Sequence, residues 1–342
     1  MKRFVILIAL GMVSFIPCSQ AQQSAALHKA EGFHHFTGTT AFQQAYTEAA
    51  PGDTIFLSGG MFAKPDTIVK TIYVFGAGHF PQFTAASNST IVSGDIVLGT
   101  GADNTYFEGL YFTGGINFLE DQGVDDVMFR RCRIDGAVNF PGTLPAINPS
   151  NNTVFLECIF TSEGEFLAQN TTGLTLTSCV FSFSRFRNIN HALLENSIAL
   201  KANSYLIYLG HNNVVRNNVS KANPNFTSSN SGNIFSNNVF LFDASYTGNN
   251  NQYINNYNDV DPETFFVSQE GSIFQYDDDY HLQNPDLYTG TDGSPVGVYG
   301  GPYPFKEGSV PFIPHIFSKN ISGSIDADGN IQVEIGVAAQ EH

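Results

Sequence analysis

The sequence predicts a solenoid of stacked β-coils, because one short phrase recurs through the middle of the chain. The phrase is an apolar pair, a bend rich in Asn, Cys or Ser, and a second apolar pair, and it returns every 18 to 26 residues. Clear copies are Val154–Phe160 and Ile234–Phe240. Such a period is typical of stacked repeats rather than of one closed globule. The low charged fraction, 13%, with many Gly, Asn, Ser and Thr, favours strands and turns over helices.

The first 21 residues have the pattern of an export signal. Lys2 and Arg3 precede an apolar run, residues 4–16, and small residues follow up to Ala21. The run is too short to span a bilayer. We therefore expect a signal peptide over residues 1–21 and an exported mature chain, in the periplasm, at the cell surface or outside the cell. Lipid attachment at Cys18 remains an alternative.

A capping helix is expected at the start of the stack. Thr39 and Thr40 can cap a helix over Ala41–Ala50, on which Phe42, Ala45, Tyr46 and Ala49 share one face. The end of an open coil stack exposes strand edges and an apolar core, so an element that covers it is needed. Residues 22–36 are expected only as a lead-in.

Two columns of the repeat are expected to face inwards. The position three before the bend holds a large apolar side chain in each coil, namely Phe107, Phe129, Phe155, Leu176, Leu194, Val215, Phe235 and Tyr253. The bend column holds Cys132, Cys158 and Cys179 in the early coils and Asn218, Asn238 and Asn256 in the late ones. We expect the cysteines to be unpaired core residues and the asparagine amides to bond to one another.

Residues after about 260 break the period. We predict three parts: the signal peptide, a β-helix with its cap over 22–260, and a covering segment with a hairpin over 261–342. The hairpin is expected from Ile321–Ile325, a turn at Asp326–Asn330 and alternating apolar residues from Ile331. Asp277–Asp279 is interpreted as a solvated acidic turn, with calcium binding as an alternative that no spacing motif supports. No cofactor is expected.

The opening coils carry a family resemblance. An amphipathic helix followed by Ala49–Ile55, Ser58–Phe62 and Tyr73–Gly78 resembles the start of exported bacterial proteins of the pectin-lyase-like superfamily. The resemblance covers about residues 37–260 and implies an all-β fold, a single-stranded right-handed parallel β-helix. It does not imply one activity, since lyases, hydrolases, epimerases and adhesins all use this scaffold.

The motifs expected of a polygalacturonate hydrolase on this scaffold are mostly missing. The chain offers Asp125-Asp126 for the acidic pair and Gly210–Asn212 for the histidine element. Adjacent residues of a strand point to opposite faces, so the two aspartates make a poor acid/base pair. A lyase needs a base and a cation that neutralises the uronate carboxylate. We take Arg185 and Arg187 as candidate catalytic residues, because alternation places both on one outward face.

The candidate substrate-binding residues belong to the same predicted row of second strands. They are Glu165 on the coil before the two arginines, Tyr205 on the coil after them, and Asn139 on an earlier coil. A plain surface ion pair between Glu165 and an arginine explains part of this group equally well. The longest inserts, 141–153 and 223–232, are expected to form groove walls if they lie on the side of Arg187.

A second charged group is expected to pair across coils on the outer wall. It consists of Arg130, Arg131 and Arg133 with Glu108, Asp135 and Glu157. The net charge of −16 argues against nucleic acid or an anionic membrane as partner.

The leading functional hypothesis is an exported polysaccharide-interacting protein, and its more specific form is a lyase-like enzyme that acts on acidic glycans. The alternative is a non-catalytic surface or adhesion module, which the absence of Trp and the low charge favour. A polysaccharide or cell-surface glycan is the expected partner in both cases. No membrane span is expected, and the oligomeric state stays open.

Overall fold

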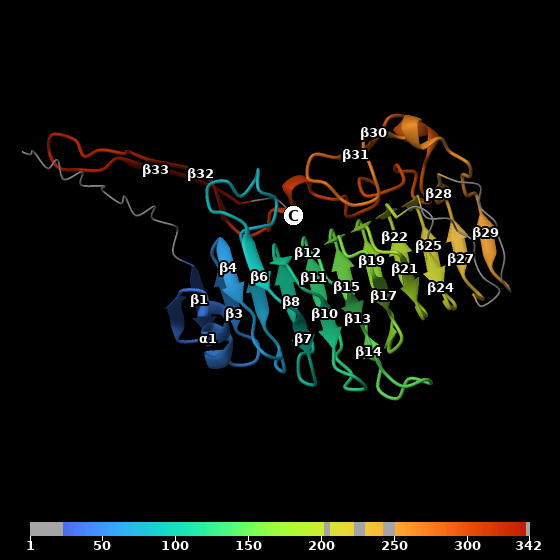
Figure 1. Ribbon diagram of the computed structural model, residues 1–342, viewed down its shortest axis with the longest axis horizontal. Helices are drawn as coiled ribbons and strands as arrows, with labels where there is room; N and C mark the ends of the chain where they lie inside the picture. The colour runs from blue at the N-terminus through green and yellow to red at the C-terminus, as the bar shows by residue number, and fades with distance from the viewer. Residues whose placement is uncertain (1–22, 202–205, 222–229, 242–249, 340–342) are drawn as a thin grey trace, which may run out of the picture.

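The chain forms a parallel β-helix of about nine turns. The structure, a computed structural model, describes residues 23–201, 206–221, 230–241 and 250–339. Within these residues, the turns contribute two or three short strands each, which build three sheets of twelve, nine and six strands along the solenoid (Figure 1). The predicted solenoid is confirmed. The expected signal peptide lies outside the described residues.

We name the sheets A, B and C in the order in which the chain enters them. Sheet A contains, in spatial order, β2 (Gly32–Thr37), β1 (Ser24–Lys29), β3 (Thr54–Leu57), β5 (Tyr73–Phe75), β8 (Tyr106–Glu108), β11 (Met128–Arg130), β15 (Val154–Leu156), β19 (Thr175–Thr177), β22 (Leu193–Glu195), β25 (Val214–Arg216), β27 (Ile234–Ser236) and β29 (Gln252–Ile254). Sheet B contains β4 (Gly60–Ala63), β6 (Thr90–Ser93), β9 (Tyr111–Phe112), β12 (Arg133–Ile134), β16 (Ile159–Phe160), β20 (Val180–Phe181), β23 (Ile198–Ala199), β26 (Val219–Ser220) and β28 (Val239–Phe240). Sheet C contains β7 (Ile96–Leu98), β10 (Ile116–Phe118), β13 (Val138–Asn139), β17 (Glu165–Leu167), β21 (Arg185–Arg187) and β24 (Ile207–Tyr208). A short parallel pair, β14 (Ser150–Asn151) and β18 (Thr171–Thr172), lies beside them.

The core is a set of side-chain columns that run along the solenoid axis. The predicted apolar column of sheet A is confirmed: its members from Phe107 to Phe235 are at most 1% exposed, and Tyr253 at the open end is partly buried. Rings on successive coils stack in parallel, as for Phe107 on Phe129 and Phe129 on Phe155, both with centroids 5.0 Å apart. Stacking of the rings on successive coils removes each ring from water and fixes the register of the coils.

A residue in the left-handed backbone region makes the corner between sheets A and B in eight coils. These residues are Gly109, Arg131, Glu157, Ser178, Asn196, Asn217, Asn237 and Asn255. Only Gly and, less readily, Asn adopt a positive φ at low cost. This requirement explains the asparagines of the late coils, and it makes Arg131 and Glu157 unusual occupants of the corner.

The next residue in each coil points inwards and forms the predicted cysteine and asparagine column. Cys132, Cys158 and Cys179 are fully buried free thiols. In the late coils the amide Oδ1 of Asn238 accepts from the backbone N–H and the Nδ2 of Asn218, both at 3.0 Å. A second ladder, which the sequence analysis missed, runs through Asn213, Asn233 and Asn251 where the chain enters sheet A.

The first end of the stack is covered by α1 (Ala41–Glu48) and by the hairpin β1–β2. The predicted helix face is confirmed, since Phe42, Ala45 and Tyr46 are buried against the first coils. The Thr40 side chain does not cap the helix, contrary to the prediction. Residues 24–37 are not a mere lead-in: β1 pairs antiparallel with β3 and β2 pairs antiparallel with β1, so this hairpin extends sheet A beyond the first coil.

Residues 257–312 form a cover over sheet B. The cover contains η1 (Pro262–Thr264), β30 (Phe266–Ser268), β31 (Asp279–Leu282), η2 (Pro285–Leu287) and η3 (Glu307–Ser309). Its apolar side chains pack on the outward residues of sheet B, such as Ile198 and Val219. In Figure 1 the orange and red cover lies along one side of the solenoid, and the loops that follow sheet C lie along the opposite side.

The cover also docks on the left-handed corner residues. Asn217 Oδ1 accepts from Thr291 N at 2.8 Å, and Asn237 Nδ2 donates to Thr289 O at 3.1 Å. Arg131, expected on an exposed outer wall, is instead 5% exposed, because the cover closes over it. The predicted pairing is present, with Arg131 Nε 2.9 Å from Glu157 Oε2, but the site is buried rather than solvated.

The chain ends in an antiparallel hairpin of β32 (His315–Ile321) and β33 (Val333–Ala338). The hairpin is confirmed, although its first strand begins six residues earlier than expected. It extends away from the solenoid (Figure 1), and apolar residues of both strands, such as Phe317 and Ile335, are exposed.

Candidate functional site

The outer face of sheet C carries the residues that the sequence analysis selected. The inward residues of this sheet are Phe118, Phe140, Phe166 and Phe186, which contact one another along the axis. Because strand residues alternate, their neighbours must point outwards. The outward row in parallel register is Asn117, Asn139, Leu167, Arg187 and Tyr208. The buried phenylalanines thus set the spacing of the surface row.

Glu165 lies between the two candidate arginines. Glu165 pairs with Arg185 across adjacent strands, and Arg185 Nε donates to Glu165 Oε1 at 2.6 Å. Arg187 Nη1 lies 3.4 Å from Glu165 Oε2. The side chain of Arg187 is 47% exposed and that of Glu165 28%, so solvent reaches this group directly. The structure therefore brings these three candidates together on one open surface.

Tyr208 supplies the aromatic side chain of this surface. It pairs with Arg187 on the neighbouring strand, and its ring lies under the Arg185 guanidinium, 4.9 Å from centroid to Cζ. A guanidinium over a ring is held by cation–π attraction as well as by its ion pair. Tyr205, the aromatic residue that the sequence analysis selected, lies outside the described residues.

Asn139 belongs to the same outward row, two coils before Arg187. Its Nδ2 donates to Asn117 Oδ1 at 2.8 Å, and it lies opposite Leu167 of the next strand. Among the residues that the structure describes, Asn139 makes no hydrogen bond with the Glu165 group, since Leu167 lies between Asn139 and Arg187 along the row. The row thus passes from two amides through Leu167 to Arg187 and Tyr208. Glu165 and Arg185 pair with each other in the adjacent outward row.

The loop 141–153 lies at the corner where sheet C turns into sheet A, close to Arg187. The Gln169 side chain links this loop to the later coils, because its Nε2 donates to Gly142 O and its Oε1 accepts from Asn188 Nδ2. Asn188 directly follows Arg187 in the chain. One of the two long inserts therefore lies along the corner that follows Arg187 in the chain. Most of the other, 223–232, lies outside the described residues.

This arrangement presents charge and hydrogen-bond donors rather than a base. An arginine guanidinium is a permanent cation with five N–H donors, and its planar fork matches a carboxylate. Arg187 has free room to offer such donors, since its exposed side chain makes one ion-pair contact at 3.4 Å. The group can therefore neutralise a carboxylate or bond to hydroxyls.

The three free thiols, Cys132, Cys158 and Cys179, are fully buried in the solenoid core. Burial raises the pKa of Cys132 and of Cys179 above the usual range, so both stay protonated. Within residues 23–201, 206–221, 230–241 and 250–339, no cluster of three or more His, Cys, Asp or Glu is placed to hold a metal ion. In the same part of the chain, no helix is both long and apolar enough to cross a membrane.

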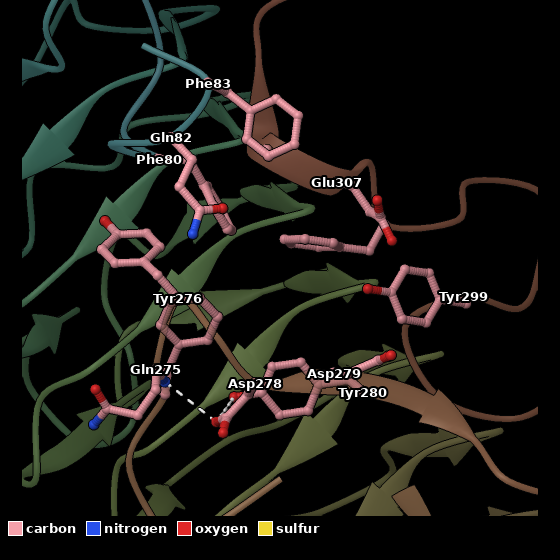
Figure 2. Close-up of a pocket in the computed structure, with 13 residues that line it drawn as sticks. Phe80, Gln82, Phe83, Gln275, Tyr276, Asp278, Asp279, Tyr280, Tyr299 and Glu307 are labelled. Carbon is pink, nitrogen blue, oxygen red and sulfur yellow. Dashed lines mark hydrogen bonds between the residues drawn. The ribbon is translucent and has the colours of Figure 1, made fainter. Parts of the chain in front are cut away.

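Sequence reasoning missed a cavity of about 270 Å³ between the cover and the turn that contains Phe80 (Figure 2). Its walls combine aromatic rings with the carboxylates of Asp278, Asp279 and Glu307. The only sequence signal was a high density of aromatic residues near Phe80 and over 274–280. That signal does not show that two distant segments meet.

These features define the class of the chain: it is a parallel β-helix protein with one covered face, sheet B, and a polar outer row on sheet C. Comparison of the chain with protein-family models, curated proteins and solved structures finds no match. The class assignment depends on the structure alone.

Proposed function

We propose that the chain is an exported β-helix protein that binds an extended polysaccharide along the outer face of sheet C. The observation that carries the proposal is the solvent-accessible Glu165–Arg185–Arg187 group beside Tyr208, in which Arg187 shares an outward row with the amides of Asn139 and Asn117. Solenoids characteristically bind along extended surfaces that their repeats create.

The composition of the row suits a sugar polymer with carboxylates. Amide groups exchange hydrogen bonds with hydroxyls, and Arg187 offers a planar fork for a uronate carboxylate. The net charge of the chain is −16, so long-range attraction to a polyanion is not expected. Recognition would depend on local, short-range contacts at the arginines.

The export part of the proposal is supported by the first 21 residues. Two basic residues, an apolar run and a small-residue stretch ending at Ala21 together match a cleavable signal. Mass spectrometry of the protein recovered from cell fractions tests this part: a mature amino terminus near Gln22 in an exported fraction is expected. An intact Met1 terminus in the cytosol would contradict it.

Binding to a panel of uronate and neutral polymers, measured by calorimetry, tests the glycan site. Arg187→Gln should weaken binding of the preferred polymer about tenfold or more, because one charge-assisted bond is lost. Arg216→Gln is the matched control. It removes the same charge from an exposed ion pair with Glu195 on sheet A, 40% exposed, and should leave the affinity unchanged. Equal effects of the two variants would reject the site.

A lyase is the second candidate, favoured by the position of loop 141–153 beside the corner that follows Arg187. In that reaction the arginines would neutralise the uronate carboxylate while a base removes the neighbouring proton. Ultraviolet absorbance of new unsaturated ends on the same polymers measures turnover. Binding without turnover identifies a non-catalytic surface or adhesion module, the other alternative for this fold.

A further inference from the structure

The cavity beneath the cover has walls from two segments that are far apart in the chain (Figure 2). Phe80 comes from the turn after β5, and the other rings come from the cover. We call this site the aromatic pocket and define it by Phe80, Phe274, Tyr276, Tyr280, Tyr299 and Phe305. Its volume of about 270 Å³ lies below the range that is typical for drug-sized ligands, so it suits a smaller molecule.

Most neighbouring rings meet edge to face, whereas Phe274 and Tyr280 stack nearly in parallel, with an interplanar angle of 17°. Phe80 and Phe274 are inclined at 81° and Phe274 and Tyr276 at 86°, with centroids 6.0 and 5.3 Å apart. Tyr299 and Phe305 on the other side are inclined at 87°. Rings at right angles surround a space with several π faces and edges, whereas a sugar ring is bound by stacking on one open face.

The charged side chains that line the aromatic pocket are carboxylates, although the Arg133 guanidinium lies 5.1 Å from the centroid of the Tyr276 ring, where it pairs with Asp135. The carboxylates of Asp278, Asp279 and Glu307 line the aromatic pocket, and no lysine or arginine is among its lining residues. Tyr280 Oη donates to Asp278 Oδ2 at 2.7 Å, so a ring of the wall and a carboxylate are coupled. Burial raises the pKa of Tyr299 above its usual range, and the charges of Glu307 and Asp279 raise it further. The site repels anions and favours cations.

The aromatic pocket is held by bonds to the solenoid. The backbone N–H of Phe274 donates to Ser182 Oγ at 3.0 Å, and Tyr276 Oη donates to His79 O at 3.0 Å. His79 itself is buried, and burial lowers the pKa of its imidazole to about 3, so it adds no positive charge near the rings. A site formed before binding loses little entropy when a ligand enters.

We propose that the aromatic pocket binds a small organic cation, a quaternary ammonium or methylated amine. The cation is held by the surrounding π faces and by the carboxylates of Asp278, Asp279 and Glu307. Such cages recognise quaternary ammonium groups in general, because methyl groups fill the apolar space while the charge attracts the rings. This site involves the cover, on sheet B, and is independent of the glycan site on sheet C.

Choline and its neutral carbon analogue 3,3-dimethylbutan-1-ol are the probes, used with the complete chain and calorimetry. The two molecules have nearly the same shape and differ in charge. Choline should bind roughly tenfold tighter or more, because only the cation gains the π and carboxylate attraction. Equal affinities, or no binding of choline at millimolar concentration, would overturn the proposal. Preferential binding of an uncharged hexose would also overturn it, in favour of a sugar subsite.

Glu307→Gln tests the role of the carboxylates without disturbing the core, since Glu307 is exposed. Choline affinity should fall several-fold, whereas affinity for the neutral analogue should not change. Glu334→Gln removes an exposed charge from the hairpin strand β33 and serves as the control. Near-ultraviolet circular dichroism verifies that both variants keep their aromatic packing. An unchanged choline affinity in Glu307→Gln would contradict the electrostatic part of the proposal.

Discussion

Arg131 combines a costly backbone conformation with a buried charge. Its φ is +51°, and its guanidinium lies between Glu108 and Glu157, which are 0% and 2% exposed. The cover completes the site, since Arg131 Nη1 donates to Val310 O at 3.2 Å and Lys306 N donates to Glu157 Oε2 at 3.0 Å. Desolvating three charges is expensive, so each must keep its partners.

Arg131→Met should lower the free energy of unfolding by about 3–5 kcal/mol, because it removes the ion pair of buried Glu108 and leaves Glu157 with Arg130 alone. Methionine has the same backbone cost at a positive φ as arginine, so this cost does not enter the difference in stability between the variant and the original protein. Arg216→Met breaks an exposed pair with Glu195 and should cost at most about 1 kcal/mol. Urea unfolding followed by circular dichroism measures both. Similar losses for the two variants would show that the buried cluster adds no stability.

The contribution of the same cluster to the stability of the folded protein depends on pH. Burial raises the pKa of Glu108 above its ordinary value of 4.5, despite the neighbouring arginines. The folded chain therefore binds this proton more readily than the unfolded chain, and stability falls as the pH rises from 4.5 through the folded pKa. The Arg131→Met loss should be largest at neutral pH and should shrink towards pH 4.5. A loss independent of pH in urea titrations would contradict this assignment.

At the scale of elements, asparagine ladders hold the late coils where the strands are only two or three residues long. Asn238 illustrates the arrangement: its Oδ1 accepts two bonds from Asn218, and its Nδ2 donates to Val215 O at 2.8 Å and to Asn256 Oδ1 at 3.0 Å. Each amide thus satisfies backbone groups that the corner would otherwise bury without partners.

Asn238→Ala should destabilise the protein by about 1–3 kcal/mol, because it leaves buried groups of Asn218 and Val215 unpaired. Asn256→Ala is the control at the end of the same ladder. Asn256 is partly exposed, so water can replace its bonds and a smaller loss is expected. Thermal unfolding ranks the two variants. A larger loss for Asn256→Ala would show that the ladder does not act as a continuous buried unit.

At the scale of the whole molecule, the cover divides the surface into a covered side on sheet B and an open side on sheet C. It buries the outward residues of sheet B and the corner column, and it builds the aromatic pocket. The outer row of sheet C, with Arg187 and Tyr208, remains accessible. A polymer on sheet C and a small cation under the cover would therefore occupy separate places.

The cover should detach from the solenoid without unfolding it. Val296→Asp places a charge in the apolar contact with sheet B, and hydrogen exchange of cover amides such as Gly297 should accelerate at least tenfold. Amides of sheet A, such as that of Met128, should keep their protection. Leu287→Asp, at a 63% exposed position of the cover, is the control. Uniform acceleration in both regions would show that cover and solenoid unfold as one unit.

The sequence alone determined the solenoid, its inward phenylalanine, cysteine and asparagine columns, and the meeting of Glu165 with Arg185 and Arg187. These predictions succeeded because each coil contacts mainly its neighbours, so the repeat in the sequence is also the pattern of contacts. Only the tertiary structure decided what lies over the outer faces. Arg131 was expected in solvent and is buried, and the aromatic pocket joins Phe80 to Tyr276. The sequence of the cover does not repeat, so a periodic pattern cannot predict which distant residues the cover contacts.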